Sequence, residues 1–248
     1  MKHILALVLL LSQNIFSQAQ FTARYAVYAT SGTLEKFEGI ESGNAEDKVF
    51  YASILNGADE TLKVLTYELK NTKETSVFEM LPNKDISFKL NNYALIAATK
   101  DKFYTSNDTL YKKVVFNKEP LIITSTLNYN WTLTKETKKI DQYTCYKATC
   151  EKQWKGLASA NGNKTTYTTT AWYCPKINSK LGPKGFGGLP GLILELQDQK
   201  TTFIIKSISF EPLDKISFEE IRTIKHLSEE EFYQKVADLK QMMFGGKK

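Results

Sequence analysis

Histidine, the residue that most often serves as a general base near neutral pH, occurs only twice in the 248-residue chain. One of the two lies in the N-terminal leader described below, so His226 is the one base left for a Ser-His-Asp or Cys-His arrangement. Its surroundings, IRTIKHLSEEEF, are typical of the entry to an amphipathic helix. We therefore expect a surface histidine and identify no catalytic residue by this route.

Carboxylates could also do chemistry, because a pair of them is enough for glycoside hydrolysis. Most acidic residues of the chain stand beside lysines in polar stretches. Glu195 is the exception, since it lies between Leu194 and Leu196. On a strand it would share a face with Ile193 and Gln197, and we interpret it as a solvated side chain. A carboxylate-based hydrolase that uses Glu195 stays the least favoured alternative.

Three cysteines, Cys145, Cys150 and Cys174, could form a disulfide or bind a metal. Cys145 and Cys150 are five residues apart on one expected strand, so their side chains point to opposite faces and should not pair with each other. In an oxidising compartment the sequence predicts a disulfide from Cys174 to either Cys145 or Cys150, with three unpaired thiols as the alternative. One histidine is too few for the usual zinc ligand sets, and we expect neither a metal nor a cofactor.

The stretch GFGGLPGLIL (185–194) has the glycine content of a phosphate-binding loop. Such a loop lies between a strand and a helix, whereas a strand pattern, LILELQ, follows here. Pro190 and Gly191 suit the central positions of a type II turn over 189–192. We expect Phe186 at the loop tip to contact a ligand or partner, together with Leu189 and Trp172. The residues interpreted as a structural turn are Gly188, Leu189, Pro190, Gly191, Leu192 and Ile193.

Alternation of polar and apolar residues dominates the chain and predicts a mainly β protein. No glycine-rich crossover from strand to helix is seen, which favours a single antiparallel sheet, strongly curved or closed into a half-open barrel. Two helices are expected: 45–55, which could equally be a strand, and one at the C-terminus, where Ser228 and Glu231 form a capping box. The expected strands are 22–30, 62–69, 76–80, 110–116, 121–129, 143–152, 165–173, 192–197 and 203–210, with hairpin turns at 71–73, 161–162 and 198–201.

Residues 1–19 are typical of a secretory signal peptide. Their apolar run, from Ile4 to Leu11, is far shorter than the roughly 20 residues that span a bilayer. Residues 20–248 are then expected to form a single β-rich domain, not membrane-spanning, that is periplasmic, associated with the outer membrane or secreted. The formal net charge of +6 is scattered in pairs rather than clustered, which argues against a nucleic-acid partner.

Aromatic side chains are numerous, with 13 tyrosines, 14 phenylalanines and 3 tryptophans. In a sheet with one buried face they would form the core. In a half-open barrel they would line a groove for an apolar ligand. We favour the core, and keep the groove as the alternative.

Two segments, WTLTKETKKIDQYTCYKATC (131–150) and AWYCPKINSKLGPKGFGGLPGLILEL (171–196), resemble the GLPGLI family of secreted and envelope proteins of Gram-negative bacteria. The family is named for the six residues found here at 188–193. The resemblance covers roughly 125–210 and implies an exported envelope protein, with no established activity or catalytic residue to carry over. A cysteine stands at position 174, where the family favours threonine, so the resemblance does not support a family-wide disulfide.

The pattern of strands and turns is more faintly similar to the half-open barrels of LolA-like periplasmic lipoprotein carriers, and this is a likeness of fold alone. The sequence thus leads us to expect a non-enzymatic envelope protein that binds an apolar or peptide-like ligand, or an outer-membrane or other envelope partner. The alternative is a structural or secretion and transport accessory protein that acts only through protein contacts.

Overall fold

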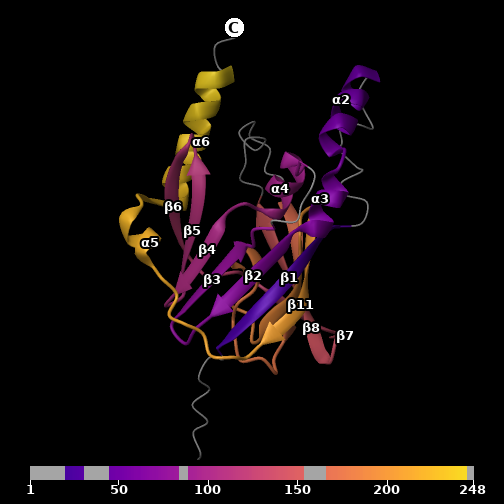
Figure 1. Ribbon diagram of the computed structural model, residues 1–248, viewed down its shortest axis with the longest axis vertical. Helices are drawn as coiled ribbons and strands as arrows, with labels where there is room; N and C mark the ends of the chain where they lie inside the picture. The colour runs from indigo at the N-terminus through magenta and orange to yellow at the C-terminus, as the bar shows by residue number, and fades with distance from the viewer. Residues whose placement is uncertain (1–19, 31–44, 84–88, 154–165, 245–248) are drawn as a thin grey trace, which may run out of the picture.

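A single sheet of 12 strands organises the computed structural model, which describes residues 20–30, 45–83, 89–153 and 166–244. The strand order is β12-β6-β5-β4-β3-β2-β1-β11-β10-β9-β8-β7, and each neighbouring pair is antiparallel except β12 with β6. The sheet curves strongly, and α6 projects from one end of it (Figure 1). The predicted fold class, a mainly β protein with one curved sheet and a C-terminal helix, is confirmed.

The elements follow one another along the chain with these bounds. They are β1 (Phe21–Ala29), α2 (Ala45–Leu55), α3 (Ala58–Val64), β2 (Thr66–Asn71), β3 (Thr75–Met80), α4 (Asn92–Ala98), β4 (Lys102–Ser106), β5 (Thr109–Phe116), β6 (Glu119–Thr126), β7 (Thr132–Ile140), β8 (Tyr143–Gln153), β9 (Thr166–Cys174), the 3₁₀ turn η2 (Pro183–Gly185), β10 (Leu192–Asp198), β11 (Thr201–Ser209), α5 (Glu219–Thr223), β12 (His226–Ser228) and α6 (Glu229–Phe244).

Local sequence signals predict several of these elements correctly. The helix at 45–55 forms as α2. The capping box of α6 is present, since the Ser228 amide donates to Glu231 Oε2 at 2.7 Å and the Glu231 amide donates to Ser228 Oγ at 3.2 Å. The turns at 71–73 and 198–201 join β2 to β3 and β10 to β11. The hairpin turn expected at 161–162 lies outside the described residues, as does the leader 1–19.

The strand expected at 62–69 is wrong in its first half. Residues Ala58–Val64 form α3, and β2 begins only at Thr66. Leu62 is buried from its place on the helix, so an apolar residue that suits a strand packs equally well from α3. Short apolar runs do not distinguish a helix from a strand, because burial requires only an apolar face.

The core lies against one face of the central strands. Alternate residues of β1, from Phe21 to Val27, have no exposed surface. The ring of Tyr67 on β2 stacks on Phe78 of β3 with centroids 5.4 Å apart, and Phe203 of β11 meets Tyr67 edge-on at 5.1 Å. Each such burial stabilises the fold by about 1.5–3 kcal/mol. The buried aromatic side chains of this cluster are Phe21, Tyr25, Tyr67, Phe78, Phe103, Tyr173, Phe186 and Phe203, so an aromatic core of the kind expected is present.

The glycine-rich segment 175–191 packs into this same core. Phe186 and Leu189 are only 3% and 1% exposed, and both belong to the cluster that contains β1 and β3. Tyr25 on β1 donates its hydroxyl to the Ile193 carbonyl at 2.8 Å, which fixes the end of the segment to the central strand. Residues of this segment thus fill part of the hollow side of the sheet with side chains of the core.

The turn before β10 differs from the type II turn expected. The Gly191 amide donates to the Leu189 carbonyl at 2.8 Å, so a three-residue turn is centred on Pro190. Gly191 has φ +158°, far from the value of about +80° that a type II turn needs. Glycine is required for another reason: a Cβ at Gly191 would lie 2.3 Å from the carbonyl oxygen of Cys174.

Candidate functional site

A pocket of about 480 Å³ opens at the end of the sheet from which α6 projects. It lies beside the filled core, between β8 and β9 on one side and β6 on the other. Most of its lining side chains are polar. The lining residues are Leu110, Ser125, Thr126, Asn128, Tyr129, Asn130, Cys150, Glu151, Lys152, Gln153, Tyr167, Gln199, Glu229 and Tyr233.

The alternation of β8 places Lys152 in this pocket. Ala148 and Cys150, four and two positions earlier, are buried on the same strand face. Lys152 follows them as a partly buried side chain, opposite Tyr167 on β9. Its Nζ lies 4.9 Å from the ring centroid of Tyr129 and 4.4 Å from that of Phe186, within the range of cation–π attraction. Burial lowers the pKa of Lys152 from its ordinary value.

The glycine-rich segment holds the aromatic wall of the pocket. The Tyr129 ring stacks on Phe186 with centroids 4.9 Å apart, and its hydroxyl donates to the Gly185 carbonyl at 3.1 Å. Trp131 Nε1 donates to the Gly187 carbonyl at 2.8 Å. Three contacts therefore join the segment between β6 and β7 to residues 185–187, so the wall is rigid.

A buried ion pair lies next to the pocket. Asp198, at the end of β10, is 3% exposed, and its two carboxylate oxygens accept from Thr169 Oγ1 at 2.9 Å and from Lys184 Nζ at 2.5 Å. Lys184 has φ +55°, a left-handed conformation held by the surrounding turn. Since both carboxylate oxygens are engaged, Asp198 serves to anchor η2 to the strands.

The titratable groups of the pocket show which chemistry they can support. Burial raises the pKa of Tyr167 to about 12 and raises the pKa values of Tyr129 and the Cys150 thiol as well. These three groups are therefore neutral near pH 7, and Cys150 is not an activated thiolate. The arrangement offers one cation, the carboxylates of Glu151 and Glu229, aromatic faces, hydroxyls and amides, which are groups suited to recognition.

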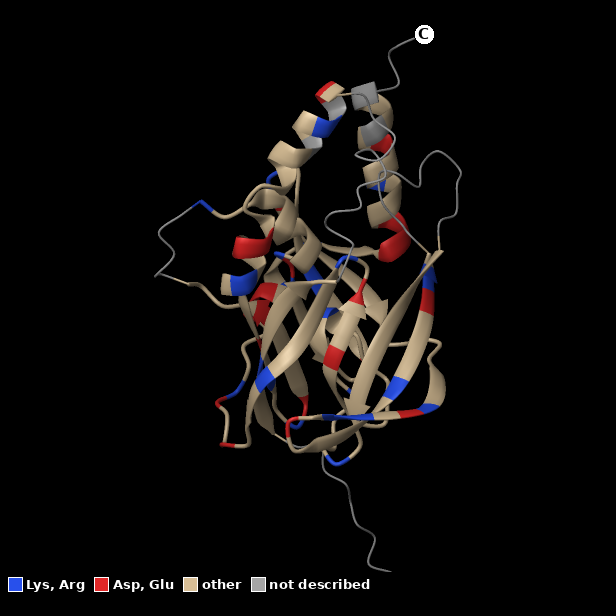
Figure 2. Cartoon of the chain, turned by 90° about the vertical axis from the view of Figure 1, so that its right-hand side faces the viewer, with Lys and Arg blue, Asp and Glu red and all other residues tan. Residues whose placement is uncertain are grey.

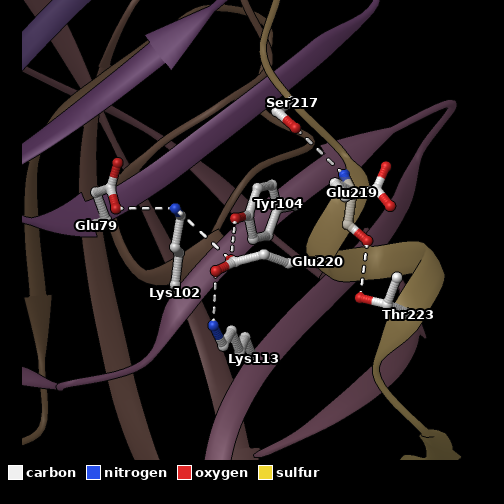
Figure 3. Close-up of polar contacts among 8 residues, drawn as sticks. All are labelled: Glu79, Lys102, Tyr104, Lys113, Ser217, Glu219, Glu220 and Thr223. Atoms are coloured by element: carbon white, nitrogen blue, oxygen red, sulfur yellow. Dashed lines mark hydrogen bonds and ion pairs between the residues drawn. The ribbon is translucent and has the colours of Figure 1, made fainter.

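A second polar cluster lies on the other face of the sheet and is structural (Figure 3). Glu220 on α5 accepts hydrogen bonds from Tyr104 at 2.7 Å and Lys113 at 2.8 Å. Lys102 pairs with Glu79 at 3.0 Å and approaches Glu220 to 3.9 Å. These contacts lower the pKa of the Glu220 carboxyl, chiefly through the hydrogen bonds from Lys113 and Tyr104. Because the charges satisfy one another, the cluster clamps α5 onto strands β4 and β5.

The contact residues expected from the sequence are separated by the structure. Phe186 is not an exposed loop tip, and Leu189 is deeper still; both are core residues, because the glycines let the segment fold inward instead of outward. Trp172 is partly exposed on β9, with Lys138 Nζ 4.4 Å from its ring centroid. Of the three, Trp172 alone has surface free for an outside partner, and Phe186 lies behind the pocket lining, stacked on Tyr129.

Glu195 and His226 have structural contacts. Both oxygens of Glu195 accept from Lys138 Nζ at 2.7 Å, so the carboxylate is ion-paired rather than simply solvated. His226 is exposed, as expected, but it lies on β12, where Nε2 is 2.6 Å from the Ile221 carbonyl oxygen. Neither residue lines the pocket.

All three cysteines are buried free thiols in the structure, so the disulfide is not formed there. The register nevertheless distinguishes the two partners expected for Cys174. Tyr146 pairs with Tyr173, which places Cys145 at the next position opposite Cys174. Cys150 instead pairs with Thr169 and lies on the opposite face of β8.

The ranges that the structure describes also bear on metal binding and on membrane crossing. No group of three or more His, Cys, Asp or Glu residues there is placed to hold a metal ion. None of the helices in those ranges combines the length and apolar character needed to cross a membrane. Basic and acidic side chains are interspersed over the strands and helices (Figure 2).

Sequence reasoning missed Lys152, Tyr129 and Tyr167 as a group. Lys152 was one of many scattered lysines, yet it continues the inward-facing series of Ala148 and Cys150, and that position was the available signal. The approach of Tyr129 could not be found in the same way, because it depends on how the segment between β6 and β7 packs on residues far along the chain.

Comparison with known proteins supports the fold and a family resemblance. Residues 131–195 match a family described as "Protein of unknown function (Porph_ging)". The matched residues include 188–193, but the description of this family does not use the name GLPGLI. Membership of the GLPGLI family therefore stays a prediction. A search of curated proteins found no match.

Among solved structures, PNGF-II has a TM-score of 0.51 and 12% identity, over 90% of this chain and 33% of that one. The chain thus spans about a third of that structure's length, and the likeness concerns the fold alone. Two other solved structures are similar at lower TM-scores. An uncharacterised conserved protein from Thermus thermophilus has a TM-score of 0.35 and 6% identity, over 86% of this chain and 92% of that one. LprF from Mycobacterium bovis has a TM-score of 0.30 and 8% identity, over 80% of this chain and 89% of that one.

Proposed function

We propose that residues 20–248 form an exported envelope domain that binds a peptide-like ligand, or a peptide-like segment of an envelope partner, without an enzymatic activity of its own. The observation that carries this proposal is the polar, aromatic-walled pocket between β6, β8 and α6. Its volume of about 480 Å³ lies in the range of roughly 300–1,000 Å³ that is usual for small-ligand sites.

A peptide-like ligand fits better than the apolar ligand that was the other expectation. The hollow of the sheet is occupied by Phe186, Leu189 and their neighbours, so an apolar molecule would have to displace core residues. The pocket beside this hollow presents amides and hydroxyls, including those of Asn128, Asn130 and Tyr233. Peptide groups need such donors and acceptors when they leave water, because an unpaired buried amide is costly.

Filling the pocket tests the proposal. Ser125→Trp would place a large ring in the pocket, while Val115→Trp would place the same ring on the exposed face of the neighbouring strand β5. Peptides from a digest of envelope proteins, mixed with the purified domain, are measured by native mass spectrometry. We expect wild type and Val115→Trp to retain peptides and Ser125→Trp to lose them. Retention of no peptide by wild type, or equal retention by all three, would overturn the proposal.

Export is tested separately. N-terminal sequencing of the protein from its native cells is expected to begin near Gln20, and cell fractionation is expected to place it outside the cytoplasm. A full-length N-terminus in a cytoplasmic fraction would contradict export and leave the pocket test unaffected.

One observation favours the second function, that of an accessory protein acting through protein contacts. Helices α2 and α6 project from the same end of the molecule in both views (Figures 1 and 2), and they expose Val49, Phe50 and Met242. Exposed apolar side chains of this size are common at protein interfaces. Crosslinking in intact envelopes, compared between wild type and Phe50→Ser, tests this: loss of one crosslinked partner supports it, and identical patterns oppose it.

A further inference from the structure

Lys152 is a cation of the pocket that the carboxylates of Asp198 and Glu229 attract only at longer range. Among the described residues, no hydrogen bond or ion pair reaches its Nζ, and its close contacts are the rings of Tyr129 and Phe186 at 4.9 and 4.4 Å. Its stem is partly buried beside Cys150 on β8. A desolvated cation whose direct contacts are aromatic faces lacks the full compensation that an adjacent anion provides.

No carboxylate among the described residues forms a direct ion pair with Lys152. Asp198 gives its two oxygens to Thr169 and Lys184. Glu151, the preceding residue on β8, is exposed and belongs to the pocket lining. Glu229 on α6 also lines the pocket and attracts Lys152 without a direct ion pair. The lysine is therefore free to pair with a negative group that enters from outside.

The surroundings of Lys152 also suit the rest of a peptide. Asn128 and Asn130 come from the segment after β6. Gln199 lies at the turn between β10 and β11. Amide side chains both donate and accept hydrogen bonds, so they can pair with the peptide groups that flank a carboxylate.

We propose that the pocket binds a carboxylate of a peptide-like ligand, with Lys152 as its counter-ion. This inference rests on the proposed function and adds the charge of the ligand. The carboxylate could belong to a chain terminus or to an Asp or Glu side chain, and both present the same two oxygens to the ammonium group. A charge-assisted hydrogen bond in a partly dry site is worth about one order of magnitude or more in affinity.

Three synthetic peptides are the probes: N-acetyl-Ala-Ala-Ala with a free C-terminus, N-acetyl-Ala-Glu-Ala-amide, and the neutral N-acetyl-Ala-Gln-Ala-amide. Each is titrated by NMR into wild type, Lys152→Met, Lys152→Arg and Lys147→Met. Lys147 is the matched control, because it lies on the other face of β8 and pairs there with Glu136 at 2.9 Å. Melting temperatures establish that each variant is folded.

We expect wild type, Lys147→Met and Lys152→Arg to bind at least one acidic peptide about tenfold or more tightly than the neutral one. Lys152→Met is expected to lose this preference, and the better of the two acidic probes identifies the source of the carboxylate. Equal binding of all three peptides to wild type, or a preference that survives in Lys152→Met, would overturn the role of Lys152 and leave peptide binding standing. Binding of none of the peptides would count against both proposals.

Discussion

The ring of Tyr129 lies nearly parallel to the ring of Phe186, with centroids 4.9 Å apart and planes 20° apart. The stack joins the connection between β6 and β7 to the glycine-rich segment that fills the core. It is also the wall against which Lys152 lies. A single aromatic contact therefore links the core of the molecule to its candidate site.

Loss of the Phe186 ring should destabilise the fold. Phe186→Ala removes a side chain that is 3% exposed, and we expect the free energy of unfolding to fall by about 3–5 kcal/mol. Phe210→Ala is the control, because Phe210 is 51% exposed and should change the value by less than about 1 kcal/mol. Urea unfolding followed by tryptophan fluorescence measures both, and similar effects of the two substitutions would show that Phe186 is not a core residue.

Substitution of Gly191 should be more damaging than that of a glycine in open space. An added Cβ at Gly191 would lie 2.3 Å from the Cys174 carbonyl oxygen, whereas one at Gly57 meets nothing within 4 Å. Gly57 has φ +72°, a left-handed conformation that alanine adopts with strain. Gly57→Ala should therefore lower the free energy of unfolding by only about 1–2 kcal/mol. Gly191→Ala should cost more than about 3 kcal/mol, because backbone atoms must shift. Melting temperatures check this, and a smaller loss for Gly191→Ala would contradict it.

Oxidation of the protein should join Cys145 to Cys174 and leave Cys150 unpaired. The ladder of β8 and β9 places the first two opposite each other, and both are fully buried. Burial is the main cause that raises the pKa of Cys145 to about 12, and the nearby Cys174 contributes to the same shift. Thiol–disulfide exchange at Cys145 should therefore be slow once the protein is folded. The cross-link should stabilise the fold by about 3–4 kcal/mol.

Peptide mapping without reduction identifies the pair. Cys150→Ser should keep the cross-linked peptide, and Cys145→Ser should abolish it. A peptide that links Cys150 to Cys174 would contradict the strand register described above.

Acid should weaken the clamp between α5 and the sheet. Hydrogen bonds from Lys113 and Tyr104 lower the pKa of Glu220 in the folded protein. The ionised Glu220 carboxylate therefore stabilises the fold fully above the unfolded-state pKa of about 4.3. This stabilisation is lost as the pH falls through the lower pKa of the folded state. We therefore expect wild type to lose more stability between about pH 5 and pH 2.5 than Glu220→Gln does, as measured by urea unfolding at each pH.

Glu219→Gln is the matched control for this comparison, since the Glu219 backbone, rather than its carboxylate, takes part in the contacts of α5. Its acid profile should follow that of wild type. If Glu220→Gln also follows wild type, the carboxylate does not stabilise the clamp.

The features that the sequence predicted correctly depend on neighbours along the chain. The capping box of α6 joins residues three positions apart, and the strand alternation of β8 and β9 repeats every two positions. Both can be recognised from composition and spacing. The strand expected after the glycine-rich segment forms as β10, and its Leu192, Leu194 and Leu196 are fully buried.

The features that the sequence did not predict depend on contacts between distant residues. Alternation does not specify which strand lies beside which, so the parallel pairing of β12 with β6 was not anticipated. The inward fold of Phe186 requires Tyr129 as its neighbour, and no local signal connects them. The pocket around Lys152 was missed for the same reason, because several separate segments of the chain form it.

The position of β1 in the sheet has a consequence for the order of events during synthesis. Thr22 pairs with Lys70 on one side and with Ser209 on the other. The first strand therefore cannot gain its second neighbour until almost the whole chain has been made. Contacts of such sequence separation form slowly, since a long loop must close before they stabilise anything. The central sheet is therefore completed only after β11 has been made, late in the synthesis of the chain.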